Sequence, residues 1–351
     1  MNTIEKIIER ITPLDSQAME LAMQRQDRLT KPRGSLGRLE DLSIQIAGIT
    51  ALPIPRLKRK AILTMAADHG VTAQGVSLYP AEVTRQMVLN FMEGGAAINV
   101  LSRMIGARVI IVDMGVRGGL PAGGGIICRP IAPGTKDMST GPAMTRRQAL
   151  DCLLAGIEIV EMEIKNGLDI LGTGDMGIGN TTSAGAITAV ISGQPVSEVT
   201  GRGTGIGGQQ LAHKIKIIEQ ALAVNRPDPA DAIDVLAKVG GFEIGGLAGA
   251  MLAAAANHIP IVIDGFISGA AALIVAGICP PARDYMIASH LSAEKGHAAC
   301  LRRLKLEPVL KLNLRLGEGT GAALGIFLAE AAVNLLGEMA TFSEAGVSDI
   351  Q

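Results

Sequence analysis

Aromatic side chains are scarce in this sequence of 351 residues. They make up 2% of the chain, with two Tyr, five Phe and no Trp. Proteins that bind single-stranded nucleic acid stack bases on aromatic rings, so this composition argues against that class. Charge of one sign is lacking too, because 32 Lys and Arg stand against 33 Asp and Glu and give a net charge of −1. No nucleic-acid partner is therefore expected.

Closely paired cysteines are also absent. The four cysteines are Cys128, Cys152, Cys279 and Cys300, and they lie far apart, whereas zinc ribbons and redox motifs use close pairs. We therefore expect no metal site. The first twenty residues carry charges throughout and lack the apolar stretch of a secretory signal. This pattern predicts a cytoplasmic protein with reduced thiols.

The sequence has no long uninterrupted hydrophobic run. Residues 244–282 carry a single charge, Asp264, but Asn257, His258 and Pro260 break the first half of this stretch. The pattern predicts a helix of small residues, a short buried strand and a second helix, all covered by protein. No membrane span is expected.

Short apolar runs that end in or beside Asp and Gly are plentiful. They cover residues 61–68, 107–116, 168–177 and 259–266, and helical patterns separate them. Buried strands that alternate with helices predict an α/β protein with a parallel sheet flanked by helices. Ligands bind such sheets at the carboxyl ends of the strands, where these Asp and Gly residues lie.

Both ends of the chain have helical patterns. Ile4, Ile7, Ile8 and Ile11 recur at helical spacing near the start. We therefore expect a small helical domain made from residues 1–44 and 287–351, beside a large α/β domain of residues 45–286.

A glycine-rich loop at 172–186 follows a predicted strand and opens a helix. Gly177 and Gly179 lie in this loop, and Asn180 or Thr181 would cap the helix. Free N–H groups at a helix start suit a phosphate, although glycines there could serve only close packing. The spacing of Gly172, Gly174 and Gly177 also fits a dinucleotide fingerprint, but one such match is weak.

A second glycine cluster at 200–210 includes Gly203 and precedes a helix that carries Lys214. Two glycine loops and a lysine could converge on one anion and form a mononucleotide site. Lys214 could equally be a solvated surface charge. No phosphate-binding loop of the GxxxxGK[ST] type occurs, which disfavours a kinase of that class.

Glu318 lies between Gly317 and Gly319 in an apolar stretch. Glycine on both sides lets the backbone approach a ligand, and an apolar setting raises the pKa of a carboxyl toward the range of a general base. The alternative is that Glu318 only complements the start of a helix.

The segment 67–87 offers two further candidates. Asp68 and His69 could form a dyad for nucleophilic catalysis, but no G-x-S-x-G motif accompanies them. Tyr79, Val83 and Met87 could be the walls of an apolar pocket for a flat ring, or ordinary core residues.

Seven ordered blocks of the sequence resemble one family, the nicotinate-nucleotide:dimethylbenzimidazole phosphoribosyltransferases. The blocks are KPRGSLGRLE at 31–40, ADHGV at 67–71, GDMGIGNTT at 174–182, DVLAKVGGFEIGGLAGAML at 234–252, DGFISGAAAL at 264–273, SHLSAEKGH at 289–297 and RLGEGTGAAL at 315–324. The resemblance covers essentially the whole chain.

The resemblance implies transfer of the 5-phosphoribosyl group from nicotinate mononucleotide to 5,6-dimethylbenzimidazole. The products would be α-ribazole 5′-phosphate and nicotinate, in the synthesis of the nucleotide loop of cobalamin. It also implies a homodimer, each chain having a Rossmann-like parallel sheet flanked by helices and a small helical domain formed by both chain ends. The scheme needs no cofactor and no metal. Departure of nicotinate needs no general acid, because its ring nitrogen is already cationic in the donor.

The resemblance further implies a role for each matching position. Glu318 would be the general base. The phosphate and nucleotide would be bound by Gly177, Gly179, Asn180, Thr181, Gly203, Lys214, Gly265 and Ser292. The base would be bound by Tyr79, Gln86, Met87, Asp175, Met176 and Leu316.

One departure from the family concerns the acceptor. Several relatives carry Glu where this chain has Asp175, and the loop Ser77-Leu78-Tyr79-Pro80 differs from the Ser-Pro form of others. The acceptor base is therefore less determined than the reaction. Two alternatives are an NAD-dependent oxidoreductase and a non-catalytic nucleotide-binding regulator. The first would need an acidic residue about 20 positions after the glycines, and the nearest is Glu198.

Overall fold

A six-stranded sheet forms the centre of the protein in the computed structural model, which describes residues 3–121, 123 and 125–348. The strands are β1 (Lys60–Ala67), β2 (Ala107–Gly115), β3 (Ile126–Cys128), β4 (Ile170–Met176), β5 (Ile261–Ile263) and β6 (Met286–Ala288). All neighbours pair in parallel, in the order β3-β2-β1-β4-β5-β6. This is the Rossmann order, and it confirms the predicted fold class. The order reverses between β1 and β4, the place where such folds bind ligands.

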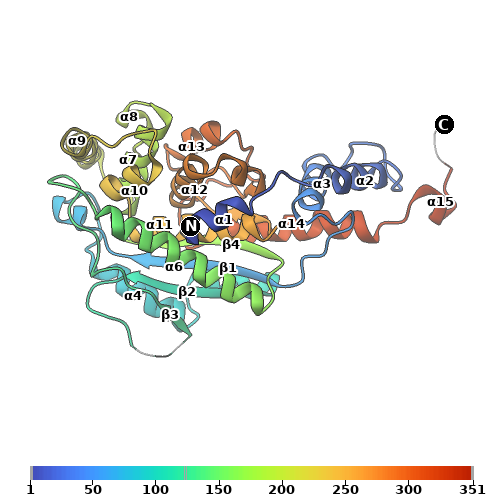
Figure 1. Cartoon of the computed structure of the whole chain (residues 1–351), viewed down its shortest axis with the longest axis horizontal. Helices are drawn as coiled ribbons and strands as arrows, with labels where there is room; N and C mark the ends of the chain where they lie inside the picture. The colour runs from blue at the N-terminus through green and yellow to red at the C-terminus, as the bar shows by residue number, and fades with distance from the viewer. Residues whose placement is uncertain (1–2, 122, 124, 349–351) are drawn as a thin grey trace.

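Helices cover both faces of the sheet (Figure 1). The α-helices of the first half are α1 (Thr3–Glu9), α2 (Ser16–Gln26), α3 (Arg38–Thr50), α4 (Glu82–Met92), α5 (Ala97–Ile105), α6 (Arg146–Lys165) and α7 (Asn180–Ser192). Those of the second half are α8 (Val196–Val199), α9 (Gly208–Asn225), α10 (Ala232–Val239), α11 (Phe242–Ala256), α12 (Phe266–Ile278), α13 (His297–Leu304), α14 (Thr320–Glu338) and α15 (Phe342–Ala345). Two 3-10 helices, η1 (Gly70–Gln74) and η2 (Pro280–Tyr285), complete the chain.

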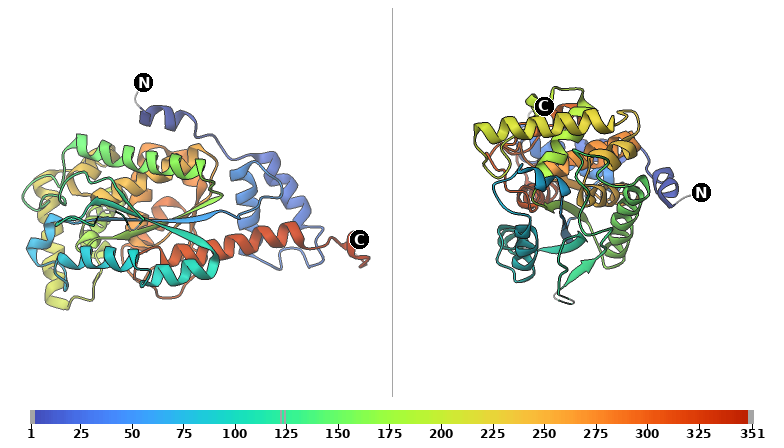
Figure 2. Two further views of the ribbon diagram at one scale, coloured as in Figure 1. Left: turned by 90° about the horizontal axis from the view of Figure 1, so that it is seen from below. Right: turned by 90° about the vertical axis from the view of Figure 1, so that its left-hand side faces the viewer.

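Strand β1 shows how the two faces are formed. Every residue of β1 is buried, and alternate side chains point to opposite faces. Leu63 and Met65 belong to a core cluster shared with α6 and α11, whereas Ile62 and Ala66 belong to a second cluster shared with α4, α5 and α14. Figure 2 shows these two helical layers on either side of the sheet. A strand buried on both faces explains the continuous apolar run in the sequence.

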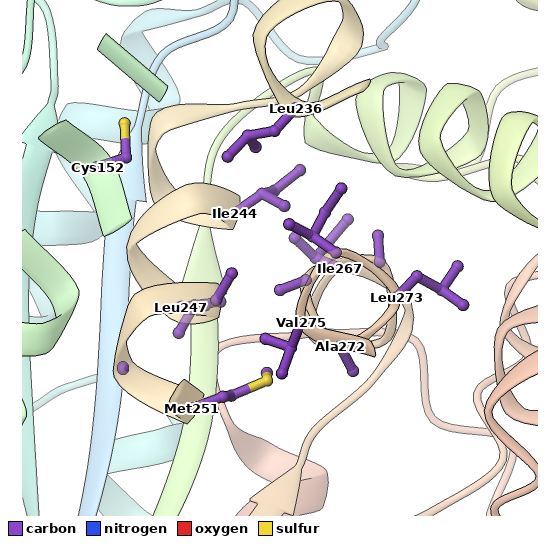
Figure 3. Close-up of a cluster of buried hydrophobic side chains, with 14 of the residues drawn as sticks. Cys152, Leu236, Ile244, Leu247, Met251, Ile267, Ala272, Leu273 and Val275 are labelled. Carbon is purple, nitrogen blue, oxygen red and sulfur yellow. The ribbon is translucent and has the colours of Figure 1, made fainter. Parts of the chain in front are cut away.

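The apolar stretch at 244–282 folds as a helix, a strand and a second helix, as predicted. Helices α11 and α12 are short and almost entirely buried, and their side chains pack together around Leu247, Met251 and Val275 (Figure 3). Among the described residues, only α14 is long and apolar enough to cross a membrane by length and composition, and 56% of its apolar window is buried inside the protein.

The two ends of the chain meet beside the sheet. Helices α2 and α3 pack on each other and on α14, and α1 instead packs on α11 and α6. In Figure 1 the end of α14 extends away from the sheet with α2 and α3 alongside it. Because α3 continues to Thr50, residue 44 lies inside a helix. The division at residues 44 and 286 stays a prediction.

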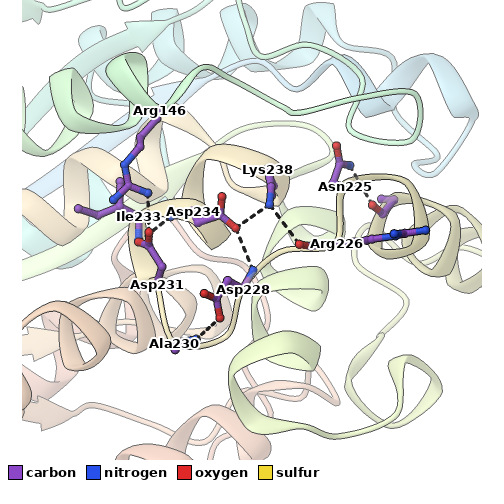
Figure 4. Close-up of polar contacts among 10 residues, drawn as sticks. Arg146, Asn225, Arg226, Asp228, Ala230, Asp231, Ile233, Asp234 and Lys238 are labelled. Atoms are coloured by element: carbon purple, nitrogen blue, oxygen red, sulfur yellow. Dashed lines mark hydrogen bonds and ion pairs between the residues drawn. The ribbon is translucent and has the colours of Figure 1, made fainter.

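Polar contacts fix the start of α10 against α6 (Figure 4). Asp231 caps α10 by accepting hydrogen bonds from the N–H groups of Ile233 and Asp234, and it pairs with Arg146 at the start of α6. Lys238 pairs with Asp234 and donates to the carbonyl of Arg226 at the end of α9. These contacts anchor α9, the helix that carries Lys214.

Candidate functional site

A cavity opens at the carboxyl ends of the strands. Loops after β4, β5 and β6 and the segment before α14 line it. The lining residues are Asp175, Asn180, Thr181, Gly265, Phe266, Ile267, His290, Ser292, Glu294, Arg315, Leu316 and Gly317. The cavity thus lies at the carboxyl ends of β4, β5 and β6, next to the point where the strand order reverses.

Two helices begin at this cavity. Asn180 and Thr181 are the first residues of α7, and Phe266 and Ile267 are the first residues of α12. Each helix is 13 residues long, and each presents the positive end of its dipole at its start. Two such ends at one cavity favour an anionic ligand.

Lys214 supplies a buried cation behind the start of α7. Its side chain is 1% exposed, and its Nζ donates to Oγ1 of Thr181 at 2.8 Å. Burial lowers the pKa of Lys214 to about 8, and the charge of Glu294 acts in the opposite direction. Gly203 lies against this pair, since a Cβ there would be 2.8 Å from Oγ1 of Thr181. Lys214 is therefore buried next to a residue that lines the cavity, and it is not a solvated surface charge.

Glu318 occupies a strained turn that leads into α14. Gly317, Glu318 and Gly319 have φ values of 83°, 64° and 103°. The left-handed region costs a non-glycine residue about 1–2 kcal/mol, and such strain gathers at functional sites. The turn is held by Thr64, whose hydroxyl donates to the carbonyl of Glu318 at 2.9 Å. Gly174 of β4 lies directly beneath, and a Cβ there would overlap that carbonyl.

The Glu318 carboxylate is buried on the side of the sheet that faces α4 and α5. The residue is 5% exposed, and its Oε2 accepts a hydrogen bond from the N–H of Ile98 in the first turn of α5 at 3.3 Å. Burial raises the pKa of Glu318, and the Ile98 hydrogen bond offsets part of that rise. A carboxylate with a raised pKa and one weak partner is suited to accept a proton.

Two further carboxylates lie next to Glu318. Asp264 accepts hydrogen bonds from the N–H groups of Gly319, Gly321 and Ala322, and so holds the start of α14. Burial raises the pKa of Asp264 to about 7. Asp175 accepts from Asn180 at 2.9 Å, but its Oδ1 has no partner. Burial, reinforced by the charge of Asp264, raises the pKa of Asp175 well above its usual value.

The structure brings several of the predicted site residues together. The predicted residues that line the cavity are Asp175, Asn180, Thr181, Gly265, Ser292 and Leu316. Gly203 and Lys214 contact Thr181, and Gly179 precedes α7 as its N-cap. Gly177 packs on the end of β1, because a Cβ there would be 2.5 Å from the carbonyl of Ala67.

The predicted base-binding residues lie mostly outside this cavity. Met87 of α4 and Met176 of β4 are half-buried against the core cluster shared with α4, α5 and α14, the side on which the Glu318 carboxylate lies. Gln86 is exposed. Tyr79 and Leu316 expose 55% and 59% of their surface, so they border an open surface rather than fill a core.

The possible dyad of Asp68 and His69 is not formed. His69 Nε2 pairs with Glu243 at 2.7 Å, and its Nδ1 lies 3.1 Å from the Ser183 hydroxyl. Asp68 instead accepts from the N–H of Arg117. His69 and Glu243 are fully buried, and His69 lies against Gly177 and Gly179.

Sequence reasoning missed three polar residues of the cavity, His290, Glu294 and Arg315. All three lie in blocks that carried the family resemblance, SHLSAEKGH and RLGEGTGAAL. No local pattern marks them, because folding alone brings the loop after β6 to the segment before α14.

The fold and cavity together define a Rossmann-like α/β protein with a cavity at the carboxyl ends of its strands, where such folds bind ligands. A family model described as "Phosphoribosyltransferase" matches residues 11–347. The chain belongs to this family.

The similar proteins agree with one another in name. Nicotinate-nucleotide–dimethylbenzimidazole phosphoribosyltransferases of Desulforudis audaxviator and of a Roseiflexus species are each 60% identical to the chain over 348 residues, covering 99% of both sequences. The crystal structure of nicotinate-nucleotide-dimethylbenzimidazole phosphoribosyltransferase from Thermus thermophilus superposes with a TM-score of 0.91 at 45% identity. It covers 96% of this chain and 100% of that one.

Proposed function

We propose that this protein transfers the 5-phosphoribosyl group of nicotinate mononucleotide to 5,6-dimethylbenzimidazole in cobalamin synthesis. The observation that carries the proposal is the buried Glu318 carboxylate beside a cavity at which two helices begin and which Arg315 lines. Relatives 60% identical over nearly their whole length bear the name of this activity. An oxidoreductase is not favoured, since the family is one of phosphoribosyltransferases.

The donor phosphate binds in the cavity between the starts of α7 and α12. Thr181, Lys214 and Arg315 supply a hydroxyl and two cations at or next to this space. Gly177, Gly179, Asn180, Gly203, Gly265 and Ser292 shape the surrounding loops. An anchor on the phosphate fixes the ribose without contact to the reacting carbon, so remote binding energy supports the chemical step.

The acceptor base binds next to the Glu318 carboxylate, on the side of the sheet that faces α4 and α5. Met87 and Met176 offer apolar surface there, and Tyr79, Gln86 and Leu316 border it. Asp175 lies between the donor cavity and the acceptor site, because it lines the cavity and its carbonyl accepts a hydrogen bond from the N–H of Glu318 at 3.2 Å.

The proposed reaction is a direct displacement at C1′ of the ribose. One ring nitrogen of the benzimidazole forms the bond to C1′, while the bond from C1′ to the pyridine nitrogen of nicotinate breaks and its electron pair returns to that ring. The Glu318 carboxylate takes the proton from the other benzimidazole nitrogen. The β configuration of the donor becomes α in the product, as expected for a single displacement without an enzyme nucleophile.

The described residues contain no group of three His, Cys, Asp or Glu side chains that could hold a metal ion, and a reaction free of metal and cofactor stays a prediction. We further propose that the protein works as a cytoplasmic homodimer. The four free cysteines fit a reducing compartment. Exposed Val100, Met104 and Phe327 on the neighbouring helices α5 and α14 offer apolar surface for a second copy.

The direct test is to incubate the purified protein with nicotinate mononucleotide and dimethylbenzimidazole and to identify the products by mass spectrometry. We expect equal amounts of nicotinate and α-ribazole 5′-phosphate. Nicotinate released without the ribazole would indicate a hydrolase, and no change in either substrate would contradict the proposal.

A further inference from the structure

Glu294 is a buried carboxylate inside the anion-binding cavity. The residue is 6% exposed and lines the cavity together with Thr181 and Arg315. Its N–H donates to the Ser292 hydroxyl at 3.2 Å, which fixes the backbone. Its Oε2 is buried and has no hydrogen-bond partner. An unpartnered charged oxygen in such a place is costly, so a role with a ligand is expected.

The groups around Glu294 are mostly cationic. Lys214 on α9 and Arg315 before α14 favour the ionised form of the Glu294 carboxyl. A hydrogen bond from the backbone of Gly203 acts in the same direction. Arg315 also donates to the Gly203 carbonyl at 3.0 Å. Asp175 and His290 are the other titratable groups that line the cavity. Outside it, Lys295 pairs with Glu198 of α8.

An ionised Glu294 balances these cations while the cavity has no anion in it, but it would repel a phosphate dianion. Burial raises the pKa of Glu294, and Lys214 is the largest influence in the opposite direction. A phosphate near Lys214 and Arg315 cancels that influence. A protonated carboxyl, unlike an ionised one, can donate its O–H to a phosphate oxygen.

We propose that the donor binds together with one proton from solvent, shared between the Glu294 carboxyl and the phosphate. Ionised Glu294 thereby neutralises Lys214 and Arg315 until the donor phosphate takes its place. The proton that Glu294 then accepts makes donor affinity depend on pH. This inference rests on the proposed function, because it takes the donor phosphate to occupy this cavity.

Titration calorimetry with nicotinate mononucleotide tests the proposal. Measurements in two buffers of different ionisation enthalpy give the number of protons bound, and affinity is measured between about pH 6.5 and 7.5, below the Lys214 pKa of about 8. For the unmodified protein we expect uptake of nearly one proton at the upper end. Affinity should fall about ten-fold per pH unit, as one linked proton requires.

Glu294→Gln should abolish the proton uptake and flatten the pH dependence, and it should bind the donor more tightly at pH 7.5. Glu198→Gln, which removes a carboxylate of the outer ion pair, should behave like the unmodified protein. Donor binding without proton uptake would overturn this inference alone, as would unchanged uptake in Glu294→Gln. A complete lack of donor binding would contradict the proposed function as well.

Discussion

Lys214 is buried and charged, and both properties matter for the donor. Replacing it by Ala removes a charged hydrogen-bond donor from the cavity, so nicotinate mononucleotide should bind more weakly by about 1.5–3 kcal/mol. Lys216, two residues further on and exposed, is the matched control, and Lys216→Ala should change little. Titration calorimetry that finds equal donor affinity for both variants would remove Lys214 from the site.

The pKa of Lys214 also makes donor affinity depend on pH. Because burial lowers this pKa to about 8, the ammonium loses its proton as pH rises through that value. Donor affinity should therefore fall further above pH 8. Lys214→Arg keeps its charge at this pH and should not show this additional loss. A parallel decline in both proteins above pH 8 would assign it to another group.

Apart from positions such as Gly265 and Ser292, which the family resemblance supplies, the sequence predicts single residues only where a local pattern marks them. Glu318 is recognisable because glycines flank it, and the structure shows why, since positions 317 and 319 have left-handed φ values. His290, Glu294 and Arg315 have no such neighbours. Their place in the cavity depends on how the β6 loop meets the start of α14, a contact between distant segments that no local pattern encodes.

Strand β4 and the turn before α14 depend on each other for close packing. Gly174 leaves space for the Glu318 carbonyl, and a methyl group there would push the turn away. Gly174→Ala should lower the free energy of unfolding by about 1–3 kcal/mol, as overpacking does, and also reduce turnover. Gly141→Ala is the control, because a Cβ at Gly141 meets no atom within 4 Å. Urea unfolding that gives both variants equal stability would contradict this view of the turn.

The long strands and the short strand β5 were predictable, whereas the equally short β3 and β6 were not. Strands β1, β2 and β4 span seven to nine residues, and their apolar runs are visible in the sequence. Strands β3 and β6 have three residues each, too few for a periodic pattern. They exist because the parallel partners β2 and β5 offer hydrogen-bonding edges.

The whole molecule presents apolar side chains on the outer face of α5 and α14. Val100, Met104 and Phe327 expose 47%, 77% and 55% of their surface. Light scattering after gel filtration should give twice the mass of one chain, and Met104→Lys with Phe327→Lys should shift it toward one chain. A monomeric unmodified protein would contradict the proposed homodimer, and an unaffected double variant would place the interface elsewhere.

In the proposed reaction Glu318 takes the proton of the attacking base during phosphoribosyl transfer. Glu318→Gln keeps the shape of the side chain and its hydrogen bond from Ile98, but cannot accept that proton at neutral pH. With both substrates saturating, release of nicotinate should slow by ~10²–10⁴-fold, the usual cost of losing a general base, while donor affinity changes little. Near-normal turnover of Glu318→Gln would contradict the mechanism, because another group would then remove the proton.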